Sequence, residues 1–274
     1  MNHPAASVII AFYNHTRFLK LVLEGLKRQS DKNFEVVIAD DGSRPEVVDE
    51  INDLTNSYPF RIRHCWHEDK GWRKNMILNN AVVASESDYL IFIDSDCIPH
   101  RHFISEHLLN REKRVILSGR RVNLSESVTE ILDTVKVQSG YLEVHILNWL
   151  LEGLKGKFTH AEKGLYLPWL TFFLTKKNYG LLGSNFSIYK EDLLSLNGFD
   201  ERYLAPTVGE DTELEYRAGL AGIKIKSVRN LAIQYHLYHP KLSRVNDNWA
   251  IFEDTKSKGM SRTPYGILKE NGAQ

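Results

Sequence analysis

The sequence has only two cysteines, Cys65 and Cys97, and neither belongs to a C-x-x-C pair or stands at a metal-ligand spacing. This excludes a metal site built on cysteine pairs and fits a reducing compartment. Net charge is also missing, because 35 basic residues balance 35 acidic ones. No net field attracts nucleic acid, so we expect no nucleic-acid partner, although charge can still segregate by face.

Long apolar runs are absent as well. The first run, residues 7–13, leads into polar Asn14 and His15 and lacks the charged start of a secretion signal. The longest aromatic and aliphatic stretch, residues 165–174, is half of the roughly 20 residues needed to cross a bilayer. We therefore expect no export and no spanning helix there, and a cytoplasmic protein that at most rests on the inner face of the membrane.

What the chain does have is 274 residues with 42% hydrophobic side chains, enough for one sizeable domain with an appendage. Strand-like and helix-like periods alternate in its first hundred residues. Such β-α-β repetition predicts an α/β protein with a mostly parallel sheet covered on both faces. The expected strands are residues 7–13, 34–39, 61–65 and 89–93, and the expected helices are residues 16–29, 45–56 and 74–84.

The second half of the chain is less regular. Residues 125–154 have the apolar pattern of one long amphipathic helix, and the tail after Pro240 is expected to be a packed extension. Further strands are expected at residues 115–118, 184–189, 223–228 and 232–235, with a helix at 211–221.

Polar side chains follow three of the expected strands. Asn14, Asp41 and the pair Asp94 and Asp96 each come directly after an apolar run. Ligands of parallel sheets bind beyond the carboxyl ends of the strands, so these groups should converge there. Two carboxylates one residue apart suit a divalent cation that carries a diphosphate. A surface turn produces the same Asp-x-Asp pattern, so the remaining motifs must decide.

Four segments together resemble the inverting glycosyltransferases of family 2, which have the GT-A fold, a Rossmann-like nucleotide-binding sheet flanked by helices. They occur in the family's order over roughly residues 7–240: SVIIAFYN at 7–14, ADDGS at 39–43, YLIFIDSD at 89–96 and GEDTELE at 209–215. Residues 197–215 also resemble the carboxyl half of galactosyltransferase and chondroitin-polymerase type enzymes. Their tryptophan-rich run is replaced here by APTV at 205–208, which leaves the acceptor open.

The resemblance implies a domain plan. Residues 1–240 form the GT-A domain, with a nucleotide-sugar-binding half at 1–120, a helical and aromatic insertion at 121–180 and an acceptor and catalytic half at 181–240. Residues 241–274 form a C-terminal extension.

The resemblance also implies the catalytic groups. Asp211 is the base that deprotonates the acceptor hydroxyl, and Glu210 orients the acceptor. The competing explanation is that both are ordinary acidic residues in the first turn of a helix.

For the cofactor, the resemblance implies Mn²⁺ or Mg²⁺. Asp96 is the preferred direct ligand, and Asp94 contacts the ribose or reaches the metal through water. A downstream histidine closes such sites in relatives, and we favour His236 over His239, although either can be a structural residue. An imidazole ligand would favour Mn²⁺ over Mg²⁺.

The donor contacts are carried over in the same way. Asp41 matches the position that accepts the uracil N3 hydrogen, and Ala11 and Tyr13 flank the base. Arg73 is a candidate for uracil or diphosphate contact, and Asn185 for the donor sugar or the acceptor. Each has a plain structural alternative: a turn or helix cap for Asp41, a solvated helix start for Arg73 and a strand entry for Asn185.

The insertion is the segment that the family does not explain. Its aromatic side chains and interspersed lysines suit peripheral association with anionic lipid or a grip on a lipid-linked acceptor. The alternative is an acceptor-side subdomain that packs its aromatics internally. The residues concerned are Trp149, Leu150, Leu151, Lys155, Lys157, Lys163, Tyr166, Trp169, Phe172, Phe173, Lys176 and Lys177.

The function expected from the resemblance is metal-dependent inverting transfer of a hexose or N-acetylhexosamine from a UDP-sugar. The acceptor would be a glycan or lipid-linked saccharide in surface polysaccharide biosynthesis. A sugar nucleotidyltransferase would instead need a glycine-rich basic loop after the first strand, where this chain has FYNHT at 12–16. A non-catalytic nucleotide-sugar or glycan-binding module needs no base, so Asp211 argues against it.

Overall fold

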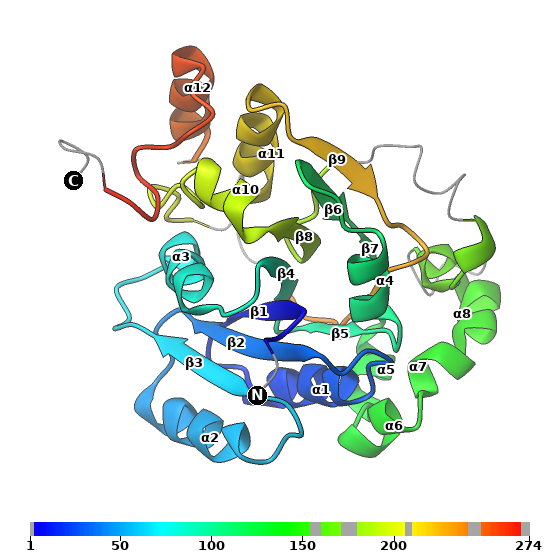
Figure 1. Ribbon diagram of the computed structural model, residues 1–274. Helices are drawn as coiled ribbons and strands as arrows, with labels where there is room; N and C mark the ends of the chain where they lie inside the picture. The colour runs from blue at the N-terminus through cyan, green and yellow to red at the C-terminus, as the bar shows by residue number, and fades with distance from the viewer. Residues whose placement is uncertain (1–2, 154–159, 171–179, 206–209, 241–247, 270–274) are drawn as a thin grey trace.

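The computed structural model describes residues 3–153, 160–170, 180–205, 210–240 and 248–269. Within them, a seven-stranded sheet has the order β3-β2-β1-β4-β8-β6-β9, and a three-stranded sheet has the order β5-β10-β7 (Figure 1). The strands of the large sheet are β1 (Ala6–Phe12), β2 (Phe34–Asp40), β3 (Ile62–Trp66), β4 (Tyr89–Asp94), β6 (Val115–Ser118), β8 (Asn185–Tyr189) and β9 (Lys224–Ser227). The small sheet consists of β5 (Cys97–Pro99), β7 (Arg120–Asn123) and β10 (Ile233–His236).

The prediction of a mostly parallel α/β sheet is confirmed. Strand β1 pairs in parallel with β2 and β4, and β2 pairs in parallel with β3. Among the described strands of the large sheet, only β8 runs against its neighbours β4 and β6. All of β2 is buried and β1 nearly so, as expected for strands covered on both faces.

Helices cover both faces of the large sheet, and Figure 1 shows α3 on one side with α1 and α2 on the other. One core contains side chains of α1 (Thr16–Lys27), α2 (Pro45–Thr55) and α4 (Phe103–Leu109). The second contains side chains of α3 (Lys74–Ala84), α10 (Lys190–Ser195) and α11 (Glu210–Leu220). Each fully buried large aliphatic side chain contributes about 1.5–3 kcal/mol, so the two cores fix the strands whose ends carry the polar residues.

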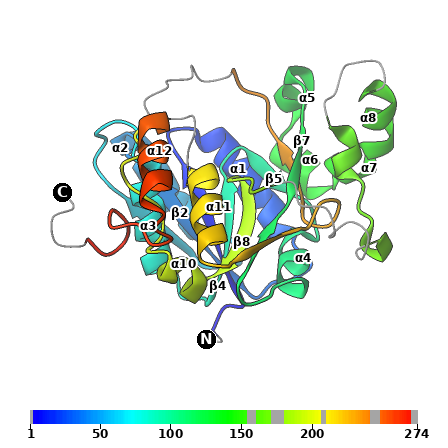
Figure 2. The same cartoon turned by 90° about the horizontal axis from the view of Figure 1, so that it is seen from above.

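The prediction of one long helix over residues 125–154 is wrong. Four short helices replace it: α5 (Glu126–Ile131), α6 (Thr134–Gln138), α7 (Tyr141–Val144) and α8 (Ile146–Gly153). Leu132 is extended, and the Asp133 side chain caps α6 by accepting a hydrogen bond from the Lys136 N–H at 2.7 Å. Gly140 has φ 79°, a left-handed conformation that interrupts helical hydrogen bonding. In Figures 1 and 2, these helices lie together at one side of the molecule.

The described part of the C-terminal extension packs against the domain. It contains α12 (Asn248–Lys258), where Phe252 is buried and Trp249 is half exposed. Two short 3-10 helices, η1 (Ala161–Gly164) and η2 (Pro168–Leu170), complete the described elements. No helix in the described ranges has the length and apolar character needed to cross a bilayer.

His107 on α4 is a fully buried histidine behind the large sheet. Its Nδ1 lies 2.7 Å from Ser187 Oγ, and its Nε2 lies 3.2 Å from Asn185 Oδ1. Burial lowers the pKa of His107 to about 3. In the unfolded chain a histidine binds a proton near pH 6.5, so protons favour the unfolded state as the pH falls from 6.5 towards 3.

We expect His107→Gln to remove this acid sensitivity. Between pH 6 and 4, the pH dependence of the free energy of unfolding should become shallower by up to about 1.4 kcal/mol per pH unit. Urea unfolding of wild type and variant at several pH values measures it, with His102→Gln on the preceding loop as the control. Equal slopes for wild type and His107→Gln would contradict the assignment.

Candidate active site

A cavity of about 680 Å³ lies beyond the carboxyl ends of β1, β2 and β4, where these strands meet the small sheet. Its lining combines apolar and aromatic surface with three aspartates, three histidines and two other cations. The lining residues are Ala11, Phe12, Tyr13, His15, Phe18, Ala39, Asp41, Trp72, Lys74, Ile77, Asp94, Ser95, Asp96, Arg121, His236, His239 and Pro240. Six of the predicted site residues are therefore brought together: Ala11, Tyr13, Asp41, Asp94, Asp96 and His236.

The loops that follow β1 and β2 lock each other in place. Asn14, at φ 55°, takes a left-handed turn that asparagine tolerates better than most residues. Its backbone N–H donates to Ser43 Oγ at 2.8 Å, and its side-chain oxygen accepts from the Arg44 N–H at 3.0 Å. Asn14, the polar residue predicted after β1, thus stabilises the wall of the cavity by hydrogen bonds to the loop after β2.

Asp41 is a buried residue of the cavity lining. Its two carboxylate oxygens accept from the Arg73 backbone N–H at 3.2 and 3.0 Å, and His67 Nε2 lies 2.8 Å from Asp41 Oδ1. Burial raises the pKa of Asp41, and the contacts with Arg73 and His67 oppose that rise. Tyr13, beside it, donates its hydroxyl to Asp69 Oδ2 at 3.0 Å.

Arg73 meets Asp41 through its backbone only. Its guanidinium donates to the backbone oxygen of Glu68 at 2.5 Å, and Arg73 is not among the described residues that line the cavity. Its neighbours Trp72 and Lys74 do line it. The contact of Arg73 with uracil or diphosphate stays a prediction, and the positive charge that lines the cavity at this point of the chain is that of Lys74.

The two aspartates of the Asp-x-Asp pair contact different parts of the cavity lining. Asp94 Oδ1 lies 3.1 Å from Lys74 Nζ at the start of α3. Asp96 Oδ2 lies 3.4 Å from His236 Nε2 and 3.2 Å from His239 Nε2. Burial acts to raise the pKa of Asp96, but the hydrogen bonds with both histidines outweigh it and hold that pKa well below its usual range.

The cluster of Asp96, His236 and His239 fits a divalent cation. Their ligand atoms all lie within 4.8 Å of one another, and no other group of three such side chains occurs in the described ranges. One carboxylate and two imidazoles suit Mn²⁺ or a similar first-row ion better than Mg²⁺, which prefers oxygen alone. The structure therefore places both histidines that the sequence offered at the same cluster.

Asp211 stands outside the cavity lining of the described residues. It lies in the first turn of α11, where its Oδ1 accepts from the Thr212 N–H at 2.7 Å. Its Oδ2 accepts from the Gly183 N–H at 3.3 Å, and the next residue, Ser184, contacts the lining residue Arg121. Asp211 is therefore connected to the lining residue Arg121 through the contacts of two adjacent residues, Gly183 and Ser184. The side chain of Glu210 falls outside the described part of the chain.

Asn185 lies behind the cavity wall and is fully buried. Its Nδ2 donates to the backbone oxygens of Arg120 at 3.1 Å and Ala232 at 2.9 Å. These contacts join β8 to the small sheet. In this structure Asn185 therefore anchors the strands that carry the site, and its proposed contact with the sugar or acceptor stays a prediction.

The helix that carries Asp211 contains a buried ion pair whose arginine also contacts the neighbouring loop. Arg217 and Glu213 are both nearly inaccessible, and Arg217 Nη2 donates to Glu213 Oε2 and to the Gly198 oxygen, each at 2.8 Å. Removing one partner of such a pair typically costs about 3–5 kcal/mol. The loop at residues 197–200 is thereby tied to α11.

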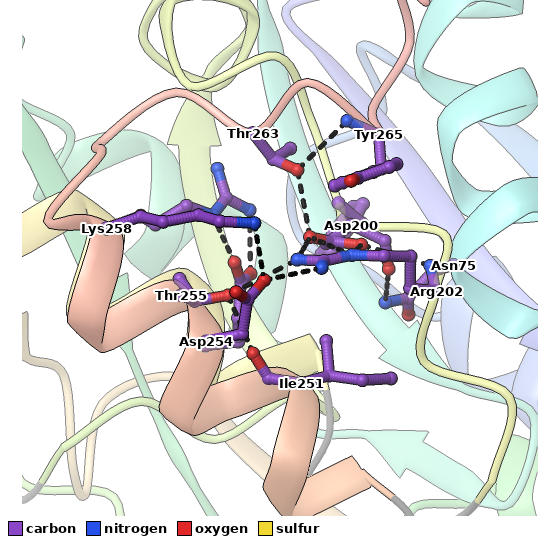
Figure 3. Close-up of polar contacts among 12 residues, drawn as sticks. Asn75, Asp200, Arg202, Ile251, Asp254, Thr255, Lys258, Thr263 and Tyr265 are labelled. Carbon is purple, nitrogen blue, oxygen red and sulfur yellow. Dashed lines mark hydrogen bonds and ion pairs between the residues drawn. The ribbon is translucent and has the colours of Figure 1, made fainter. Parts of the chain in front are cut away.

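The same loop is held from the other side by the C-terminal extension (Figure 3). Asp200 accepts from Arg202 at 2.8 Å and from Thr263 Oγ1 at 2.9 Å, and Arg202 also reaches Asp254 on α12 at 2.9 Å. The Asp200 backbone oxygen accepts from Asn75 on α3 at 2.7 Å. The helices α3 and α11 are therefore joined through one loop.

Several lining residues were missed by sequence reasoning. The sequence indicated only a helix start or a turn at three of them, Lys74, Trp72 and His15. Arg121 lies on β7, a strand of four residues that carries no periodic signal.

The fold can now be compared with solved structures. A mannosyltransferase from Pyrobaculum calidifontis, solved in complex with GDP-Man and Mn²⁺, aligns with TM-score 0.58 at 17% identity, over 92% of this chain and 61% of that one. Residues 1–349 of TarS from S. aureus align with TM-score 0.52 at 18% identity, over 84% and 60%. These likenesses show the fold, which is that of the GT-A class.

The family follows from the sequence comparison. Residues 7–158 match glycosyl transferase family 2, and residues 171–240 match the family described as the N-terminal domain of galactosyltransferase. The chain belongs to glycosyltransferase family 2.

Among curated relatives, the chondroitin synthase of Escherichia coli is 26% identical over 96% of this chain and 39% of its own length. The hyaluronan synthase of Pasteurella multocida is 23% identical over 96% of this chain and 28% of its own length. The chain thus spans about two fifths or less of the length of these two relatives.

We expect His236→Ala and His239→Ala each to weaken Mn²⁺ binding at least tenfold, because each removes one of three ligands and even outer contacts of metal sites are worth that much. Calorimetric titration of Mn²⁺ measures the loss, with His160→Ala, an exposed histidine on another segment, as the control. Wild-type affinity in either variant would remove that histidine from the ligand set.

Proposed function

We propose that this chain transfers a hexose or N-acetylhexosamine from a UDP-sugar, with inversion, to a glycan or lipid-linked saccharide in surface polysaccharide biosynthesis. The observation that carries the proposal is one cavity lined both by Asp41 and by the cluster of Asp96, His236 and His239. A nucleoside diphosphate needs an acceptor that recognises its base and a cation site for its phosphates, and this cavity offers residues of both kinds. The chondroitin and hyaluronan synthases among the relatives support a polysaccharide product.

Asp41 is the proposed reader of the nucleobase. A buried carboxylate must be paired with donors, and a uracil N3–H supplies one. Ala11 and Tyr13 lie beside it on the cavity lining. The Arg73 backbone N–H already holds the carboxylate in place, so we propose that Arg73 acts there through its backbone.

The transfer proposed here is a single displacement. Asp211 accepts the proton of the acceptor hydroxyl, whose oxygen forms the bond to the anomeric carbon. The bond from that carbon to the β-phosphate oxygen breaks, and its electron pair leaves with UDP. Asp96, His236 and His239 would hold a divalent cation, which when bound would supply Lewis-acid stabilisation of the leaving diphosphate. Glu210 is proposed to orient the acceptor and Asp94 to contact the ribose.

Asp211→Asn should abolish transfer, with a loss of at least a hundredfold in kcat, because the amide cannot accept the proton. Affinity for the UDP-sugar should stay within about twofold of wild type. Donor consumption with Mn²⁺ and calorimetric binding measure the two quantities.

Glu253→Gln is the matched control for Asp211→Asn, since it makes the same carboxylate-to-amide change on the exposed side of α12. Retained turnover in Asp211→Asn would refute the base assignment. A parallel loss of donor binding would instead show that Asp211 serves the donor site.

We also propose peripheral association with the cytoplasmic face of a membrane, which fits the two free cysteines of a reducing compartment. Of the aromatic side chains in the insertion, Trp149 packs internally against Tyr235, whereas Trp169 is 74% exposed. Phe172, Phe173, Lys155, Lys157, Lys176 and Lys177 lie outside the described residues. The support comes from Val135, Val144, Leu147 and Leu151 on α6 to α8, which are 61–73% exposed.

The double variant Val144→Asp, Leu147→Asp should lose co-flotation with anionic liposomes, because it places charge on the apolar surface that would enter the lipid. Leu109→Asp, at an exposed leucine on α4, is the control and should float like wild type. Unchanged flotation of the double variant would reject this surface as the contact.

A further inference from the structure

Arg121 and Lys74 are the two permanently charged cations among the described residues that line the cavity. Arg121 lies on β7, whose register pairs it with Gln234, two residues before His236 on β10. Paired residues project to the same face of a sheet, and alternate residues along a strand share a face. Val122 points the other way, into the core. Arg121 and His236 therefore face the cavity from neighbouring strands.

The two cations differ in their partners. Lys74 Nζ lies 3.1 Å from Asp94, so its charge is already balanced by a carboxylate. Arg121 Nη1 instead donates to a neutral oxygen, Ser184 Oγ, at 3.3 Å, and Gln234 Nε2 donates to the same oxygen at 3.1 Å. No carboxylate of the described chain forms an ion pair with Arg121. The contact with Ser184 positions the guanidinium without balancing its positive charge, so that charge can interact with an anionic ligand.

Arg121 also shares the cavity with the proposed metal ligands. Asp96, His236 and His239 line it together with Arg121, and the register of β7 and β10 places Arg121 and His236 on the same face of the small sheet. An anion bound at the cluster would therefore lie in the same cavity as the guanidinium.

We propose that Arg121 binds the β-phosphate of the donor and stabilises the nucleoside diphosphate as it leaves. When the anomeric carbon bonds to the acceptor oxygen, its bond to the β-phosphate oxygen breaks and the electron pair stays on that phosphate. The negative charge there grows, and a planar guanidinium can donate two hydrogen bonds to it. The inference rests on the proposed function, because it assigns a residue to the leaving group of that reaction.

The contacts of residues 183 and 184 join this site to the proposed base. Gly183 N–H donates to Asp211 Oδ2, and Ser184 Oγ accepts from Arg121. Two adjacent residues thus set the spacing between the group proposed to take the proton and the group proposed to receive the departing charge. Ser184 is a positioning residue in this scheme.

The test compares the affinity for UDP and UMP in the presence of Mn²⁺, by calorimetry, because UMP lacks the β-phosphate. Arg121→Gln should weaken UDP binding tenfold or more, the usual worth of a hydrogen bond to a charged group, and leave UMP binding unchanged. Arg121→Lys should recover part of the loss. Ser184→Ala should lower the UDP affinity in the same selective way by a smaller factor, and Mn²⁺ binding without nucleotide should stay as in wild type.

Arg120→Gln is the matched control, since it removes the same charge one residue away. Arg120 donates to Ser118 Oγ and the Gly180 oxygen at 3.0 Å and lies off the cavity lining. Its UDP affinity should match wild type.

Unchanged UDP affinity in Arg121→Gln, or an equal loss for UDP and UMP, overturns the assignment of Arg121. If the wild type binds GDP instead of UDP, the uridine preference in the proposed function fails, and GDP against GMP then tests Arg121 in the same way. A wild type that binds no nucleoside diphosphate with Mn²⁺ rejects both proposals.

Discussion

The pairing of β10 with β5 is the contact on which the rest of the site depends. Its antiparallel register sets His236 opposite Cys97, so a residue more than a hundred positions later in the chain reaches the Asp-x-Asp turn at the end of β4. The Leu237 N–H also donates a hydrogen bond to the backbone oxygen of Asp96 at 2.8 Å. A shift of this register by one residue would turn the His236 imidazole to the opposite face and dismantle the cluster.

The small sheet can hold that register because its two faces differ. Ile98, Val122 and Tyr235 point into the larger core and are almost fully buried. The opposite face carries Arg121 and His236 towards the cavity. Burial of the apolar face fixes which side chains turn towards the ligand, so the hydrophobic core and the charge pattern of the site are set by the same alternation.

The nucleotide-binding half was accessible from the sequence because its order is local. Strands of five to seven residues alternate there with helices, and polar residues such as Asp41 and Asp96 follow strand ends, where topology makes them converge. The small sheet could not be predicted from the sequence in the same way. Its strands β5 and β7 were missed, because a strand of three or four residues has no recognisable periodicity and their partner β10 comes more than a hundred residues later. Arg121 was missed with them. The break at Asp133 and Gly140 was hidden by an amphipathic pattern that continues across it.

The two halves of the site are coupled by contacts that share residues. Asp200 is hydrogen-bonded to α3 through Asn75 and to the C-terminal extension through Thr263, and the adjoining loop is tied to α11 by Arg217. Displacement of α11 would therefore disturb α3, whose first turn contributes Lys74 to the cavity. Across the cavity, residues 183 and 184 join Asp211 to Arg121. The proposed proton acceptance and stabilisation of the leaving group both require positions accurate to fractions of an ångström. A framework that ties both groups to two adjacent residues and to one loop meets that requirement.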